Sequence, residues 1–227
     1  MRVRKEFIRL EGVKSPKLIV IAAEGRMTEN IYFEAMKVSL CASRVQLEIL
    51  HREENASSPD NVYSQIKAFK DEYKIKEDDE LWIVVDKDRW EDKMLSEVAQ
   101  SCASDNNLHF CLSNPCFELW LLLHLEDIST YSEEQMTKLK ANKKAKKNGD
   151  TWLKRRMRSL MGQYSESKYD ANKLLPNVEE AIGRAKQLDK KPKDRWPQKV
   201  GTRVYLLAES IMDKGREVDR KGLALKI

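Results

Sequence analysis

The sequence predicts an α/β protein in which helices flank a mostly parallel sheet, followed by a helical C-terminal part. Two short apolar runs, Leu18–Ala23 and Leu81–Val85, have the length of strands and contain no polar residue. Such runs are typical of strands that are buried on both faces of a parallel sheet. Helical segments separate these runs from two further strand-like runs, and this alternation indicates right-handed βαβ units.

The strands and helices follow one another regularly through the first half of the chain. After the strand Leu18–Ala23, the segment that begins at Thr28 has apolar residues at positions 32, 33, 36 and 40, which suits an amphipathic helix. Val45–Leu50 alternates apolar and polar residues and predicts a second strand. The remaining predicted elements here are a helix over Asn61–Tyr73, strands at Leu81–Val85 and Leu108–Leu112, and a helix over Met94–Ala103.

A strongly apolar helix is predicted next, over Phe117–His124. Pro115 suits the first turn of a helix, where its missing N–H is not needed, and we expect Ser113 or Asn114 to cap that turn. The rest of the chain is predicted to be helical, apart from a connector at Lys190–Pro197. The expected helices are Glu133–Lys147, Thr151–Met161, Leu174–Leu188 and Thr202–Lys214.

Length and composition predict a globular protein. Of the 227 residues, 41% are hydrophobic and 35% are charged, which allows a core under a heavily charged surface. We expect residues 1–127 to form the α/β core and residues 128–227 to form a helical region that packs on it. No apolar run approaches the roughly 18 residues that cross a bilayer, and the basic N-terminus lacks a signal-peptide stretch. We therefore expect a cytoplasmic protein that does not enter a membrane.

The cysteines and histidines do not favour a zinc site. The four cysteines form no Cys-x-x-Cys pair, so we expect reduced, buried thiols, and the chain has only three histidines. We expect any bound metal to be a hard ion that is held by oxygen atoms.

Acidic residues follow the two apolar strands directly. Glu24 comes after Leu18–Ala23, and Asp86 and Asp88 come after Leu81–Val85. Ligand sites of open α/β sheets lie at the carboxyl ends of the strands, so these acids are expected to meet. Carboxylates brought together repel one another unless a cation bridges them. Mg²⁺ (or Mn²⁺) is the natural cation, and it would activate a water molecule and stabilise charge on a phosphate.

Other residues are candidates for contacts with a nucleic-acid substrate. Arg26 and Thr28, at the start of a predicted helix, are expected to hold a phosphate. Between Lys138 and Arg158 the chain has ten basic residues and one acid, Asp150. Such a block is usually a solvated surface, but beside a nuclease-like site it is a candidate surface for backbone phosphates.

The order of these motifs resembles that of the Toprim domain of topoisomerases, primases and OLD-family nucleases, and more narrowly the RloB-like family. The stretches that carry the resemblance are Ala23-Glu-Gly-Arg-Met-Thr-Glu29 with Tyr32-Phe33, Leu81-Trp-Ile-Val-Val-Asp-Lys-Asp88, Ser113-Asn-Pro-Cys-Phe-Glu-Leu-Trp-Leu-Leu-Leu-His124, Lys168-Tyr-Asp170, and Trp196-Pro197 with Thr202-Arg-Val-Tyr205. The resemblance implies a Toprim-like core, an association with restriction and abortive-infection defence, and an inferred nuclease activity.

The resemblance adds candidates to the site, each with an alternative. Glu118 is either a further metal or catalytic carboxylate or the partner of a buried base such as Arg26 or Lys168. Glu29 is either a ligand or an acid that the helix dipole favours. The remaining candidates are Ser113 and Asn114, as caps or substrate contacts, Lys168, as a contact to the transition-state phosphate, and His124, as a helix-end residue or a catalytic group.

These observations predict a Mg²⁺-dependent nuclease, with RNA favoured over DNA if the role is abortive infection. Asp86 and Asp88 would hold the metal, and Glu24 would bind it or act as general acid or base. The alternative is a binding module that holds nucleic acid or a metal–nucleotide without turnover and works with an ATPase encoded nearby. A primase-like polymerase ranks last, because the chain has no zinc-ribbon cysteines.

Overall fold

The centre of the protein is a five-stranded sheet, seen in a computed structural model that describes residues 3–9, 16–51 and 57–213. Its strands are β1 (Lys17–Ala23), β2 (Val45–Leu50), β3 (Glu80–Asp86), β4 (Leu108–Asn114) and β5 (Gly201–Thr202). The strand order is β2-β1-β3-β4-β5, in which only the last pairing is antiparallel. The predicted α/β class with a mostly parallel sheet is therefore confirmed.

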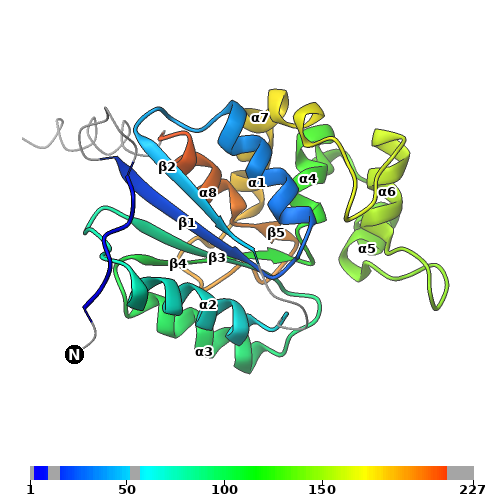
Figure 1. Ribbon diagram of the computed structural model, residues 1–227. Helices are drawn as coiled ribbons and strands as arrows, with labels where there is room; N and C mark the ends of the chain where they lie inside the picture. Colours follow the sequence, from blue (N-terminus) through cyan, green and yellow to red (C-terminus); the bar gives the residue numbers. More distant parts are fainter. Residues whose placement is uncertain (1–2, 10–15, 52–56, 214–227) are drawn as a thin grey trace, which may run out of the picture.

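Helices cover both faces of this sheet (Figure 1). On one face lie α2 (Pro59–Glu72) and α3 (Asp92–Ala103); on the other lie α1 (Thr28–Ser39), α4 (Glu118–Leu125), α7 (Val178–Leu188) and α8 (Val204–Ile211). Side chains alternate between the two layers along each strand. Ile19 and Ile21 of β1 belong to one apolar core, and Leu18 and Val20 belong to the other.

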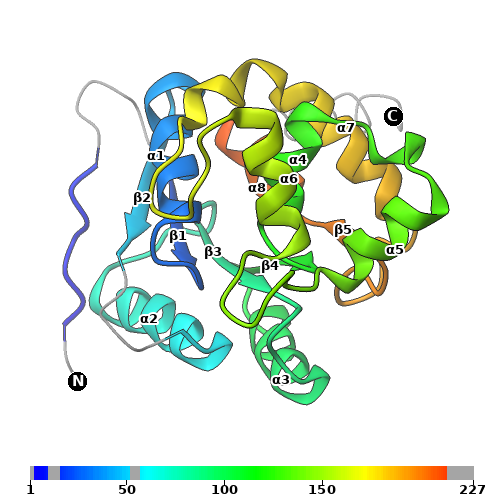
Figure 2. The same ribbon diagram turned by 90° about the vertical axis from the view of Figure 1, so that its right-hand side faces the viewer.

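The remaining helices, α5 (Glu133–Ala141) and α6 (Trp152–Met161), lie beyond the carboxyl end of the sheet (Figures 1 and 2). Leu139 of α5 and Leu153 and Met157 of α6 are buried in the same apolar core as Ile19. One core thus includes side chains from both sides of the expected boundary at residue 127, and the division into two domains stays a prediction.

The start of α4 differs from the prediction. The helix begins at Glu118, with Phe117 as its N-cap, so neither Ser113 nor Asn114 caps it. Both residues instead extend β4, where they pair with Thr202 and Gly201 of β5. Pro115 lies between strand and helix, after a cis peptide bond with Asn114. Strand pairing therefore occupies the two residues that were expected to cap the first helical turn.

Three C-terminal helices are also shorter than predicted. Helix α5 ends at Ala141, because Asn142 adopts a left-handed conformation with φ of 39°. Helix α7 begins at Val178, after two 3₁₀ turns (Ala171–Lys173 and Leu175–Asn177), since Pro176 cannot sit inside an α-helix. Helix α8 spans Val204–Ile211, and the predicted end at Lys214 lies outside the described residues. A third 3₁₀ turn, Ile128–Thr130, precedes α5.

Strand β5 is missing from the prediction, since its two residues, Gly201 and Thr202, carry no strand pattern of their own. The side chain of Arg203 holds the residues next to this edge of the sheet in place. Its guanidinium is buried and pairs with Asp189 at 3.0 Å, and it donates to the carbonyl oxygens of Lys191, Asp194 and Arg195.

In the described ranges, all four cysteines are free thiols. No helix in these ranges has the length and apolar character of a membrane span.

Candidate metal centre

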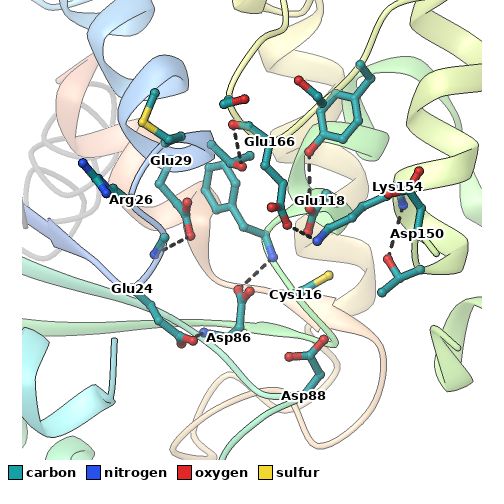
Figure 3. A pocket seen from close by; sticks show the side chains of 18 of the residues that line it. Glu24, Arg26, Glu29, Asp86, Asp88, Cys116, Glu118, Asp150, Lys154 and Glu166 are labelled. Carbon is teal, nitrogen blue, oxygen red and sulfur yellow. Dashed lines mark hydrogen bonds and ion pairs between the residues drawn. The ribbon is translucent and has the colours of Figure 1, made fainter. Parts of the chain in front are cut away.

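Seven carboxylates line one cleft at the carboxyl ends of β1 and β3 (Figure 3). Five of them come from three segments near these strand ends, and two belong to the far wall: Glu24, Glu29, Asp86, Asp88 and Glu118, and then Asp150 and Glu166. The cleft has a volume of about 460 Å³, and α6 with the loop after it forms its far wall. The structure thus places the four carboxylates that were predicted to be catalytic along one cleft, together with Glu29, for which a ligand role was one of two alternatives.

Main-chain bonds fix the ends of the two central strands. The amide of Glu24 donates to the carbonyl of Val84 at 2.8 Å, which continues the parallel ladder by one residue. The amide of Asp86 donates to Oε2 of Glu24 at 3.1 Å, so the first acid binds the backbone of the second. Asp86 Oδ1 in turn accepts from the amide of Phe117 at 2.8 Å. The acids are therefore positioned by the sheet and by the start of α4.

Gly25 allows Glu29 to fold back into the cleft. Oε1 of Glu29 accepts a hydrogen bond from the amide of Gly25 at 3.1 Å. A Cβ atom at Gly25 would lie 1.8 Å from Oε2 of Glu29, well inside contact distance. Glu29 is only 3% exposed. The Glu24-Gly25 sequence thus contributes to the placement of two carboxylates. Glu24 is itself one of them, and Gly25 leaves space for the side chain of Glu29, one helical turn later.

Glu118 is the first residue of α4 and is buried at the inner end of the cleft. Its Oε1 accepts a hydrogen bond from the hydroxyl of Tyr164 at 3.3 Å. The two bases that were considered as buried partners, Arg26 and Lys168, are both exposed. Neither base is buried, so the alternative of a buried base as partner does not apply to them, and Glu118 bonds to the hydroxyl of Tyr164 instead.

Asp88 lies at the exposed edge of the cleft, beyond the end of β3. Its amide and that of Lys87 both donate to the carbonyl of Pro115 at 3.1 Å. The side chain of Lys87 pairs with Asp92 at 2.5 Å. The turn therefore directs one acid into the cleft, while the intervening lysine pairs with the start of α3.

The carboxylates raise one another's pKa values. Burial, followed by the charges of Glu118 and Glu24, raises the pKa of Glu29 to about 7. Burial and then the charges of Glu29, Glu24 and Glu118 raise the pKa of Asp86 well above its usual range. Burial also raises the pKa values of Glu24 and Asp88. A cation in the cleft would relieve this repulsion.

The donors fit a hard cation by their chemistry. They are carboxylate oxygens, which Mg²⁺ and Mn²⁺ prefer. Cys116 also lines the cleft, but burial raises the pKa of its thiol well above the usual range, so it is not a thiolate ligand. In the described part of the chain, no three His, Cys, Asp or Glu side chains are close enough as placed to share one ion. The acids thus surround the cleft without converging on one point.

Cationic residues form the opposite wall of the cleft. Lys154 on α6 forms an ion pair with Glu166, and Arg158, one turn later, pairs with Asp150 at 2.6 Å. Both bases come from the predicted basic block. The hydroxyl of Thr28 donates to the carbonyl of Glu166 at 3.1 Å, which connects the start of α1 to this wall. Arg26 also lines the cleft.

Three predicted substrate contacts lie outside the lining of the cleft. Ser113 is fully buried and bonds to the hydroxyl of Thr202 at 2.7 Å. Asn114 donates to the carbonyl of Pro197 at 3.1 Å. Lys168 lies in an adjacent groove. His124 is buried and bonds to the hydroxyl of Tyr32 at 2.9 Å, as a structural residue of α4.

Sequence reasoning did not single out Lys154, Tyr164 or Glu166, which all line the cleft. Lys154 was hidden among other basic residues of similar spacing. Tyr164 and Glu166 follow α6 in a loop without a recognisable motif, so only the packing of α6 against α4 brings them to the acids.

A mostly parallel sheet with clustered carboxylates at its carboxyl end defines an α/β protein with a candidate site for a divalent cation. The model of the RloB-like protein family matches residues 19–211, which includes every residue that lines the cleft. The chain belongs to the RloB-like family. Comparison with curated proteins gives no match. Comparison with solved structures gives none either.

Proposed function

We propose that this chain is a Mg²⁺- or Mn²⁺-dependent phosphodiesterase of the Toprim-like type that cleaves nucleic acid, with RNA favoured, in bacterial anti-phage defence. The observation that carries the proposal is the cleft itself. Glu24, Glu29, Asp86, Asp88 and Glu118 surround it near the carboxyl ends of the central strands, and basic residues of α6 face them. Carboxylates hold the cation that phosphoryl chemistry needs, and lysine and arginine attract the phosphates.

In this proposal, different carboxylates bind the cation and transfer the proton. Asp86, Asp88 and Glu24 hold the cation, which when bound supplies an activated water and stabilises charge on the phosphate. Glu29 or Glu118 accepts a proton from the attacking water, and the raised pKa of Glu29 suits proton transfer near neutral pH. These roles depend on charge and proximity to the substrate, so neutral substitutions test them directly.

Lys154 has a further task, which is to attract the phosphate. It is held over the cleft by its ion pair with Glu166 (Figure 3). A phosphate that enters the cleft competes with the Glu166 carboxylate for this ammonium group. Lys154 thus contributes to substrate affinity, while the carboxylates contribute to the chemical step.

One observation favours the second candidate, a binding module that acts with a partner ATPase. The described carboxylates surround the cleft without three of them being close enough to share an ion. A protein of this kind would bind nucleic acid or a metal–nucleotide alone and would need its partner for any turnover. Activity of the purified chain separates the two candidates.

The test is incubation of the purified protein with tRNA, mRNA and plasmid DNA, with and without Mg²⁺ or Mn²⁺. Wild type, Asp86→Asn and the control Asp60→Asn, which neutralises an exposed acid in the first turn of α2, are compared. The proposal expects metal-dependent cleavage by wild type and Asp60→Asn and none by Asp86→Asn. Equal cleavage by all three proteins would disprove the assignment. Absence of cleavage by the purified wild-type protein without a partner would favour the binding module.

A further inference from the structure

A second hollow lies beside the acidic cleft, on the other side of the loop that follows α6. It is an open groove of about 980 Å³, larger than the cleft. The two hollows share three lining residues, Arg158, Tyr164 and Ser165. The groove and the cleft are therefore neighbours along the turn at residues 165–168. An extended polymer that occupies the cleft and continues past this turn would enter the groove.

The groove and the cleft have opposite charge. Three bases, Arg158, Lys168 and Lys173, and one acid, Asp170, line the groove. Lys168 and Lys173 are exposed, and neither side chain forms an ion pair or hydrogen bond within the described residues. Asp170 accepts from the amide of Asn172 at 3.2 Å, within its own turn. Two unpaired ammonium groups are therefore available to a ligand beside the acidic site.

The walls of the groove are fixed by the acidic site itself. Tyr164 donates to Glu118, and Tyr169 donates to the carbonyl of Thr28 at 2.7 Å. Ser165 and Lys168 exchange backbone hydrogen bonds of 3.0 Å, which closes the turn between the hollows. Lys168 is thereby held at a defined position relative to the carboxylates.

The chemistry of the lining favours phosphate over bases. Both tyrosine rings are buried, with Tyr164 3% exposed and Tyr169 9% exposed, and their hydroxyls are engaged. They offer no exposed ring face on which a base would stack. The groups that remain are cations on flexible stems, and these contact backbone phosphates without regard to sequence.

We propose that this groove holds the phosphodiester backbone of the nucleic-acid strand next to the bond that is cleaved. Lys168 and Lys173 contact neighbouring phosphates, and Arg158 lies where the strand passes from groove to cleft. The inference rests on the proposed function, and it gives the substrate strand a direction out of the site, along the loop after α6 and away from α2 and α3.

The test compares wild type with the double variant Lys168→Ala/Lys173→Ala. The control, Lys37→Ala/Lys93→Ala, removes two exposed lysines on α1 and α3 that line neither hollow. The probe is a fluorescent 12-nucleotide RNA in Ca²⁺, with its integrity checked on a gel. Circular dichroism and thermal unfolding establish that each variant is folded.

We expect the groove variant to bind the RNA on the order of tenfold more weakly, while the control variant binds as wild type does. The slope of log affinity against log salt should fall by about 1.4, since each phosphate contact on a single strand contributes about 0.7. Equal weakening in the groove and control variants, or no binding by wild type, overturns the inference.

Hydrolysis of a small substrate, bis-p-nitrophenyl phosphate in Mn²⁺, separates this inference from the proposed function. This substrate fills the cleft without reaching the groove, so the groove variant should retain wild-type turnover. Absence of hydrolysis by wild type would count against the proposed function. The RNA-binding comparison would still test whether the groove binds the strand. Loss of hydrolysis in a folded groove variant would contradict a separate backbone site.

Discussion

The carboxylate of Glu24 accepts a hydrogen bond from the backbone amide of Asp86, with 3.1 Å between Oε2 and N. This bond joins the ends of β1 and β3 directly beyond the last paired residues, Ala23 and Val84. Glu24 therefore both lines the cleft and positions the acid opposite to it. Substitutions at these acids should therefore affect folding as well as ligand binding.

Asp86→Asn and Asp86→Ala should differ in stability but not in metal binding. Asparagine keeps an oxygen for the amide of Phe117 and removes a charge that Glu29 and Glu24 repel. Alanine leaves that amide without its partner, at a cost of about 1–3 kcal/mol. We expect Asn to unfold at or above the wild-type temperature in EDTA and Ala to unfold below it, with both failing to bind Mn²⁺. A lower melting temperature for Asn than for Ala would contradict this account.

Gly25→Ala should displace the Glu29 carboxylate from the cleft. The new Cβ would lie 1.8 Å from Oε2 of Glu29, and the side chain is the part that can move. We expect Mn²⁺ affinity to fall by about tenfold or more, as for lost supporting groups at other metal sites. Calorimetric titration measures this change.

The double variant Gly25→Ala/Glu29→Ala is the control for this prediction. If the clash with Glu29 causes the loss of Mn²⁺ affinity, Gly25→Ala should lower the affinity little further once Glu29 has been shortened to alanine, so the two losses of affinity will not add. Strict additivity of the two losses would show that Gly25 acts through the backbone instead.

Stability without metal should fall as pH rises through neutrality. Glu29 has a pKa of about 7 in the folded protein against 4.5 as its ordinary value, so the folded state binds the extra proton between these values. The resulting stabilisation is present below about pH 4.5 and is lost as pH rises through about 7, on the order of 2–3 kcal/mol. Glu29→Gln should weaken this dependence in denaturant titrations in EDTA without abolishing it, because the raised pKa of Asp86 acts in the same sense. Glu34→Gln on the same helix should retain it in full.

Saturating Mn²⁺ should reverse that dependence, because the metal binds the deprotonated carboxylates and its binding releases protons. If wild type and Glu29→Gln had the same pH profile with and without metal, Glu29 would not titrate in this range.

His124 should act in the opposite sense. Its Nδ1 donates to the carbonyl of Trp120 at 2.9 Å, so its Nε2 accepts from the hydroxyl of Tyr32 and the ring is neutral. Burial lowers the pKa of His124 from 6.5 to about 4. The unfolded chain therefore binds the proton first, and stability is lost as pH falls from about 6.5 to about 4, by about 3 kcal/mol.

His124→Gln should remove this loss, and His51→Gln, at a histidine whose side chain is 70% exposed, serves as the control. Chemical denaturation at pH 6.5 and pH 4 measures the difference. An acid-induced loss that is unchanged in His124→Gln would show that another group is responsible.

Much of the sheet and of the acidic site could be predicted from sequence, because both depend on local patterns. The apolar runs mark the buried strands, and parallel strands present their carboxyl ends at one edge. Glu24 and Asp86 directly follow two such runs, so their meeting required only that β1 and β3 be neighbours, as they are.

The basic block was predicted, but which of its residues reach the cleft could not be, because this depends on contacts between distant segments. Lys154 and Tyr164 reach the acids only through the packing of α6 beside α4. Strand β5 was missed for a related reason, since its two residues pair with β4 only after α7 and Arg203 have positioned them. The predicted cap of α4 was wrong, because Ser113 has the side chain of a cap residue but pairs with β5 as part of β4.

The central claim, that these carboxylates bind a divalent cation, is tested most directly by calorimetric titration of Mn²⁺ into wild type, Asp86→Asn and Asp60→Asn near neutral pH. We predict saturable binding by wild type and Asp60→Asn, with proton release that increases below pH 7, and no binding by Asp86→Asn. Absence of saturable binding in wild type, or equal binding by all three proteins, would contradict the account.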